Sequence, residues 1–203
     1  MRNKIYSAGL LFLVSVSVIA SGCGSKPSPS VETGVSAEQQ RADAAGFQEF
    51  SDRVKDYVKL HNSQEAVIPA VKATDLPEMI NAHQQALARK IREARPNAKP
   101  GDIFTSAARK SFEDVIQSAM RGPRGANADA TMKQGAPLTE TSLIVNQGYP
   151  DGIPYTTVPP TLLQVVPKLP DEVVYRVVVH DLVLLDLKAN LVVDLIPGII
   201  PQI

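Results

Sequence analysis

The stretch VVYRVVVHDLVLLDLKANLVVDLI, residues 173–196, decides how this chain folds. It is rich in β-branched and aromatic residues, which pack well on a pleated sheet. His180-Asp181 and the segment 187–190 interrupt it at the spacing of tight turns. The sequence therefore predicts a three-stranded antiparallel β-meander over residues 171–203.

The pairing of these strands follows from the two turns, with Val179 facing Leu182 and Asp186 facing Leu191. Alternate side chains then fall on two faces, and the first is expected to cover the helices. The first face holds Tyr175, Val177, Val179, Leu182, Leu184, Leu191, Val193 and Leu195. The second face holds Arg176, Val178, Val183, Leu185, Val192 and Asp194. Because the second face is more apolar than an exposed face, we expect another segment to cover part of it.

Three amphipathic patterns before the strands predict a three-helix layer over residues 36–122. The first helix begins at a capping box formed by Ser36 and Gln39 and is expected to run to about Leu60. Its apolar stripe is Phe47, Phe50, Val54, Tyr57 and Val58. Asn62-Ser63 is expected to end it.

The second and third helices have start and stop signals of their own. Asp75 and Glu78 form a capping box, and Pro96 follows the last turn. The stripe of the second helix is Leu76, Ile80, His83, Leu87, Ile91 and Ala94. Thr105 is the expected N-cap of the third helix, which ends at Gly122-Pro123.

Residues 123–170 connect the helices to the strands. Seven prolines between Pro137 and Pro170 exclude a long helix or a central strand there. Apolar side chains lie between these prolines, so we expect an ordered proline-rich wrap on the core, with one helical turn at 161–165. The whole of 36–203 is predicted to be a single α+β domain.

The N-terminus has the layout of a secretory signal peptide over residues 1–22. Arg2 and Lys4 precede an apolar run over 5–20, and small residues lead to Cys23. The apolar run is shorter than a comfortable membrane span.

Ala20-Ser21-Gly22-Cys23 resembles the lipobox of bacterial lipoproteins. The resemblance implies cleavage between Gly22 and Cys23, and lipid on Cys23 that holds the protein to a membrane. Several acyl chains are needed for stable attachment. Residues 23–35 would be the lipidated tether. The expected location is the extracytoplasmic side of the cell envelope, at the outer membrane if the cell has two. The alternatives are an uncleaved anchor helix, or a plain secretory signal with an incidental cysteine.

Composition limits the chemistry of the body. The chain has 21 basic and 21 acidic residues, and removal of Arg2 and Lys4 leaves 19 basic residues and a net charge of −2. Such a balance gives no general attraction for nucleic acid. Cys23 is the only cysteine, which excludes an internal disulfide and a cysteine-based zinc site. No cofactor motif is present, and no catalytic or metal-binding residues are assigned.

The titratable residues that stand out each have an ordinary structural interpretation. His83 is expected to be a hydrogen-bonded core or boundary residue, His61 to contact the end of its helix, and His180 to lie in a turn. Asp186 and Asp194 fall on opposite faces of the predicted sheet, which argues against a general acid/base pair. The basic clusters Arg89, Lys90, Arg92 and Arg95, and Arg121 to Arg124, are expected to be solvated.

The ending of the body, Tyr-Arg followed by Leu-Val-Leu-Leu-Asp and Val-Val-Asp, resembles exported bacterial proteins of unassigned function, and the resemblance carries no site residues. Three hypotheses remain open. The first is a non-catalytic lipoprotein that binds an envelope protein or acts as a scaffold. The second is an envelope hydrolase of unrecognised type. The third is a small-molecule binding module.

Overall fold

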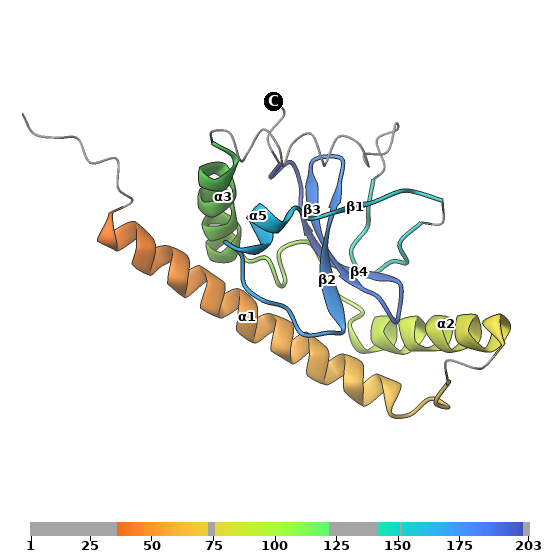
Figure 1. Ribbon diagram of the computed structural model, residues 1–203. Helices are drawn as coiled ribbons and strands as arrows, with labels where there is room; N and C mark the ends of the chain where they lie inside the picture. Colours follow the sequence, from red (N-terminus) through yellow and green to blue (C-terminus); the bar gives the residue numbers. More distant parts are fainter. Residues whose placement is uncertain (1–35, 73–75, 122–141, 151, 201–203) are drawn as a thin grey trace, which may run out of the picture. The chain divides into compact units, whose positions relative to one another are not determined.

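The computed structural model describes residues 36–72, 76–121, 142–150 and 152–200. These residues form an α+β body with helices in the N-terminal half and a four-stranded antiparallel sheet at the C-terminal end, in the order β1-β2-β3-β4. β2 (Val173–Val178), β3 (Asp181–Asp186) and β4 (Leu191–Ile196) form the predicted meander. The fourth strand, β1 (Thr156–Thr157), was not predicted and comes from the proline-rich segment (Figure 1).

The three long helices lie close to their predicted positions. α1 spans Ala37–Glu65, α2 spans Pro77–Ala94 and α3 spans Ser106–Met120. Ser36 and Thr105 are the N-caps of α1 and α3, and their side chains accept hydrogen bonds from the backbone N–H groups of Gln39 and Ala108. The capping role predicted for the Gln39 side chain is wrong, because this side chain donates hydrogen bonds to Asp43 and Asp114 instead of contacting the start of the helix backbone.

α2 differs from its prediction at its N-terminal end. Its N-cap is Leu76, and Asp75 lies outside the described residues. The predicted stripe is buried only over the second half of the helix, at Leu87 and Ile91, whereas Leu76 is 66% and Ile80 42% exposed. The start of α2 therefore extends beyond the core that its second half joins.

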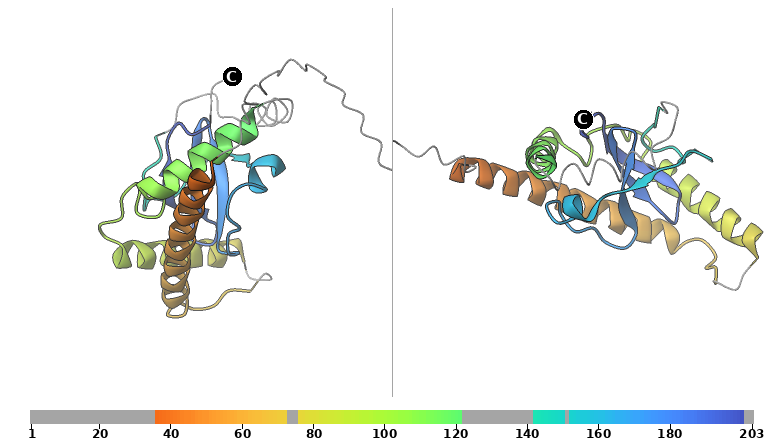
Figure 2. Two further views of the ribbon diagram at one scale, coloured as in Figure 1. Left: turned by 90° about the vertical axis from the view of Figure 1, so that its left-hand side faces the viewer. Right: turned by 45° about the horizontal axis from the view of Figure 1, so that its top comes forward.

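One face of the sheet packs on the helical layer, as predicted. Phe50 of α1, Phe112 of α3 and Tyr175 of β2 meet in the centre of this core, with ring centroids 5.0 to 6.1 Å apart. α1 crosses α3 closely (Figure 2). A Cβ atom added to Gly46 would lie 2.7 Å from the carbonyl oxygen of Ala107, so glycine is required at this crossing.

The opposite face of the sheet is covered by the proline-rich segment, which confirms the predicted wrap. Leu143, Val145, Tyr149 and Ile153 pack there, against Val178, Val183, Leu185, Val192 and Leu195. The predicted helical turn is α5, Pro160–Leu163. This segment thus closes a second, smaller core.

The predicted register is wrong in two places. Val178 pairs with Asp181, so the first turn is Val179-His180, and Val179 has a positive φ of 55° and packs toward the second face. In β4, a bulge leaves Val193 as an extra residue between the pairs Leu184–Asp194 and Leu185–Val192. A bulge shifts the alternation of side chains beyond it. Leu195 consequently packs on the second face, and Asp194 turns toward the helical half.

Candidate functional site

A buried polar cluster centred on Asp186 lies between the sheet and α1. One carboxylate oxygen of Asp186 accepts a hydrogen bond from the Tyr57 hydroxyl at 2.7 Å and lies 2.6 Å from Nδ1 of His61. The other accepts the backbone N–H of Ala189 at 2.9 Å, which ties the carboxylate to the turn after β3. Asp186 and His61 are both 0% exposed.

The position of His61 corrects the sequence prediction. α1 continues through Asn62-Ser63 to Glu65, so His61 is followed by another helical turn. The side chain faces the core, and its closest partner is Asp186 of β3. Because a carboxylate only accepts hydrogen bonds, Nδ1 of His61 carries the proton that is shared with Asp186.

The charges around His61 favour its protonated form. Burial lowers the pKa of His61, but the hydrogen bond and negative charge of Asp186, together with the charge of Glu65, outweigh burial and raise it. Nε2 of His61 is buried without a hydrogen bond of good geometry and lies 3.4 Å from Glu65. An imidazolium at this position is therefore held between two carboxylates, one from β3 and one from α1.

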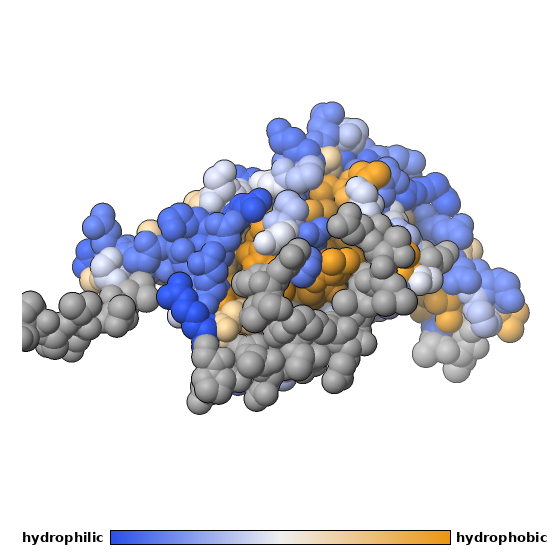
Figure 3. All heavy atoms as spheres, turned by 90° about the horizontal axis from the view of Figure 1, so that it is seen from above, coloured by the Kyte–Doolittle hydropathy of each residue, from blue (hydrophilic) through white to orange (hydrophobic). Residues whose placement is uncertain are grey.

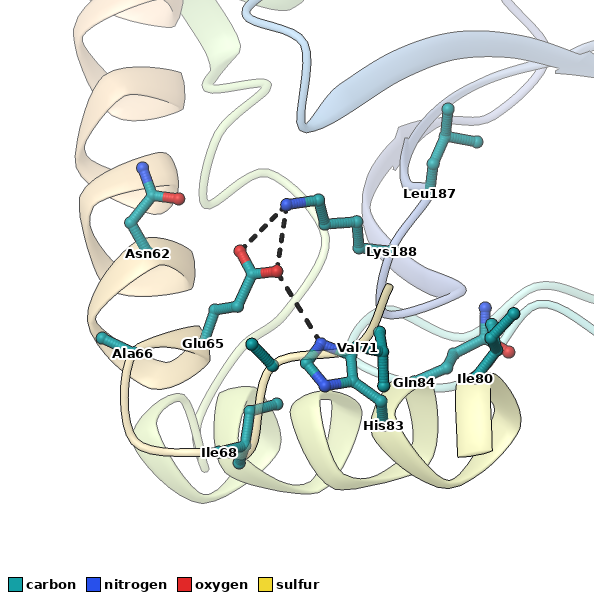
Figure 4. Close-up of a pocket in the computed structure, with 11 residues that line it drawn as sticks. Asn62, Glu65, Ala66, Ile68, Val71, Ile80, His83, Gln84, Leu187 and Lys188 are labelled. Carbon is teal, nitrogen blue, oxygen red and sulfur yellow. Dashed lines mark hydrogen bonds and ion pairs between the residues drawn. The ribbon is translucent and has the colours of Figure 1, made fainter. Parts of the chain in front are cut away.

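Glu65 connects this buried cluster to the surface. Burial raises the pKa of Glu65, but the hydrogen bond and charge of Lys188, with the charge of His61, outweigh burial and keep it below its usual range. Both carboxylate oxygens of Glu65 lie 3.0 Å from Nζ of Lys188. Nε2 of His83 lies 3.7 Å from Oε1 of Glu65. Figure 4 shows these three side chains converging from α1, the turn after β3, and α2.

A cavity of about 630 Å³ opens beside this group, between the end of α1, the first half of α2 and the turn after β3 (Figure 4). Its apolar lining is Ala66, Ile68, Ala70, Val71, Ile80 and Leu187, and its polar lining is Asn62, Glu65, His83, Gln84 and Lys188. Among the described residues of this lining, none carries a hydroxyl or thiol. The size and the mixture of apolar walls with a few polar groups are typical of a ligand site.

The rim of the cavity is unusually apolar for an exposed surface. Five large apolar residues with 42% to 68% exposure lie on or next to its lining segments, namely Val67, Leu76, Met79, Ile80 and Leu187. In Figure 3 apolar side chains are open to solvent at the right-hand end of the view, where Figure 1 draws the start of α2. A surface patch of this kind often marks an interaction site.

The remaining histidines agree with their predictions. His83 donates from Nδ1 to the carbonyl oxygen of Pro69 at 2.9 Å and is a boundary residue. His180 lies in the turn between β2 and β3.

The basic cluster on α2 is only partly solvated, which corrects the prediction for Arg95. Its guanidinium lies over the ring of Tyr57, 5.1 Å from the centroid, and donates to the backbone carbonyl of Val193. Arg89 and Lys90 are exposed as expected. Arg121 follows α3, and the rest of its predicted turn lies outside the described residues.

Asp194 forms a second buried carboxylate site with different partners. Its oxygens accept four backbone N–H groups, from Gly101 at 3.0 Å and from Ile103, Phe104 and Leu195 at 2.8 Å each. These bonds fix the loop that leads into α3. The predicted separation of Asp186 and Asp194 on opposite faces is wrong, because both reach the helical half, but each carboxylate is occupied by its own partners.

Several predictions concern residues that the structure does not describe. The signal peptide over 1–22, its cleavage between Gly22 and Cys23, and the tether over 23–35 all lie outside the described residues. In the part that is described, no helix has both the length and the apolar character to cross a membrane. Within the same residues, no group of three or more histidine, cysteine or acidic side chains is arranged to hold a metal ion.

Comparisons with known proteins gave no relative from which a function could be inferred. The chain matches no protein-family model, no curated protein and no solved structure.

Proposed function

We propose that this protein is a lipoprotein of the cell envelope, anchored through lipid on Cys23, whose folded body acts by binding rather than by catalysis. The observation that carries the binding role is the cavity of about 630 Å³ at the end of α1, with its exposed apolar rim and its internal ion pair. Such a surface is suited to hold an apolar partner while a few polar groups orient it.

The anchoring part of the proposal rests on the lipobox-like sequence 20–23. Wild-type protein expressed in a bacterial host is expected in the membrane fraction, with the mass of a mature chain that starts at Cys23 and carries acyl groups. Cys23→Ser should lose the acyl mass and leave the membrane fraction. Retention of Cys23→Ser at the membrane with unchanged mass and processing would contradict lipid anchoring.

The binding part is tested on full-length protein extracted in mild detergent. Native mass spectrometry of the wild type should show a bound small molecule or protein, and Ile80→Asp at the cavity should release it. Leu163→Asp is the matched control, because Leu163 is similarly exposed, at 45%, and does not line this cavity. An identical empty spectrum for wild type and Ile80→Asp, or equal loss in both variants, would count against a binding role at the cavity.

A hydrolase is the second candidate, and the Asp186–His61 pair favours it. An aspartate that orients a histidine is part of many nucleophilic sites. Here, however, His61 is fully buried, and its Nε2 faces Glu65 rather than a hydroxyl. Turnover of carboxylic or phosphoric ester substrates that is abolished by His61→Gln in a correctly folded protein would favour this candidate over binding.

A further inference from the structure

The charges that line the cavity define the kind of ligand that fits it. Among the described residues that line the cavity, Glu65 is the one carboxylate, and it is surrounded by the ammonium of Lys188, Nε2 of His83 and Nε2 of His61. On the core side, the carboxylate of Asp186 lies 2.6 Å from Nδ1 of His61. Glu65 is thus already matched by Lys188 at 3.0 Å, and Nε2 of His83 lies 3.7 Å from its carboxylate.

A cationic ligand would have to reach Glu65, whose side chain is only 27% exposed, and displace Lys188 from it at short range, which is unfavourable. An anionic ligand would meet Lys188, whose side chain is 57% exposed and reachable. Electrostatic complementarity therefore favours a negative head group.

The rest of the cavity is suited to an apolar body. Ile68, Val71, Ile80 and Leu187 form its walls, and Ile80 and Leu187 are each 42% exposed. Burial of these side chains against a ligand removes apolar surface from water, which stabilises the complex. Small-molecule sites of this size usually combine apolar walls with a few polar groups that orient the ligand.

We infer that the cavity binds an amphiphilic monoanion, with its carboxylate on Lys188 and its apolar part against Ile68, Ile80 and Leu187. This inference rests on the proposed binding function and narrows it to one chemical class. Glu65 has a defined role in it, because Glu65 competes with the ligand for Lys188 and so weakens binding.

Three probes with the same apolar chain separate the contribution of the head group. Decanoate, decylammonium and decanol, each below the concentration at which it forms micelles, are titrated calorimetrically into full-length protein in a detergent that does not occupy the cavity. Decanoate should bind most tightly. A tighter complex with decylammonium, or equal affinity for decanol, would overturn the inference.

Two substitutions are expected to act in opposite directions on decanoate affinity. Lys188→Gln should weaken it about fivefold, the range for an exposed ion pair, and leave decanol unchanged. Glu65→Gln should tighten it by a similar factor, because Lys188 is released from its carboxylate. Circular dichroism and thermal melting establish that each variant is folded.

Lys55→Gln is the matched control, since Lys55 forms an exposed ion pair with Asp52 on α1 and does not line the cavity. It should leave all three affinities unchanged. Weaker decanoate binding in Glu65→Gln would contradict the inference, because Glu65 would then be helping the ligand. If none of the probes binds but native mass spectrometry shows a protein partner that Ile80→Asp releases, the binding function stands and the small-molecule inference fails.

Discussion

Asp186 and Asp194 are both fully buried aspartates in neighbouring strands, yet their surroundings differ in kind. Asp194 accepts backbone N–H groups only, and these donors do not titrate. Asp186 accepts hydrogen bonds from the side chains of Tyr57 and His61. His61 in turn contacts Glu65, which lines the cavity. The first arrangement holds a loop in place, whereas the second connects a buried histidine, whose pKa is raised, to the wall of the cavity.

The largest loss of stability is expected from substitution of Asp194. Asp194→Asn is expected to lower the free energy of unfolding by about 4 kcal/mol, because the amide keeps one acceptor and turns its NH₂ group toward two buried N–H donors. The loss should be the same at pH 6 and pH 9, since no partner of Asp194 titrates in this range. Urea unfolding at several pH values measures it. A pH-dependent loss would mean that Asp194 is linked to a titrating group.

Asp186→Asn should reduce stability by about 3 kcal/mol at pH 6, because it removes the counter-charge of a buried imidazolium. The folded-state pKa of His61 is raised, so its contribution is fully present below the unfolded pKa and is lost as pH rises through the folded value. The gap between wild type and Asp186→Asn should therefore narrow from pH 6 to pH 9. A gap that stays constant from pH 6 to pH 9 would show that His61 is neutral in the folded protein over this range.

Gly46→Ala is the control for this pH dependence. It introduces a clash between α1 and α3, away from both aspartates, and should reduce stability by about 2 kcal/mol. Because no charge changes, the reduction should be equal at pH 6 and pH 9. If this variant followed the same pH profile as Asp186→Asn, the profile would belong to the fold and not to the His61 pair.

Tyr57→Phe removes one hydrogen bond to Asp186 and is expected to have the smallest effect on stability. It should reduce stability by about 1.5 kcal/mol, the contribution of one hydrogen bond to a charged acceptor. The ring that lies under Arg95 is kept. Burial and the charge of Asp186 raise the pKa of Tyr57, so the effect should not vary between pH 6 and pH 9. An unchanged free energy of unfolding would indicate that His61 and the backbone N–H of Ala189 satisfy Asp186 without Tyr57.

The parts of the fold that local patterns determine were predictable. The β-branched runs predicted β2 to β4, and side-chain caps at Ser36 and Thr105 predicted where α1 and α3 begin. The apolar second face of the meander indicated a cover, and the proline-rich segment provides it. For the strands and the helix starts, the signal lies within a few residues of the structure that it specifies.

The polar cluster could not be predicted because it depends on contacts between distant segments. Alternation of side chains does not reveal the bulge at Val193, so Asp194 was placed on the wrong face. Asn62-Ser63 is typical of a helix end, but α1 continues through it to Glu65 with His61 buried against the sheet. One signal was present: His61 follows Tyr57 by four residues, on the same stripe as Phe50 and Val54, which indicates a buried side chain.

α1 also sets a length within the body. Its 29 residues form a rod of about 43 Å, which begins at the first described residues and ends at the cavity. Under the proposed anchoring, the lipid-bearing segment joins the body at the start of this rod, one rod length along α1 from the cavity. Removing whole helical turns from the exposed N-terminal part of α1 would shorten that path along the helix while leaving the residues that line the cavity as they are.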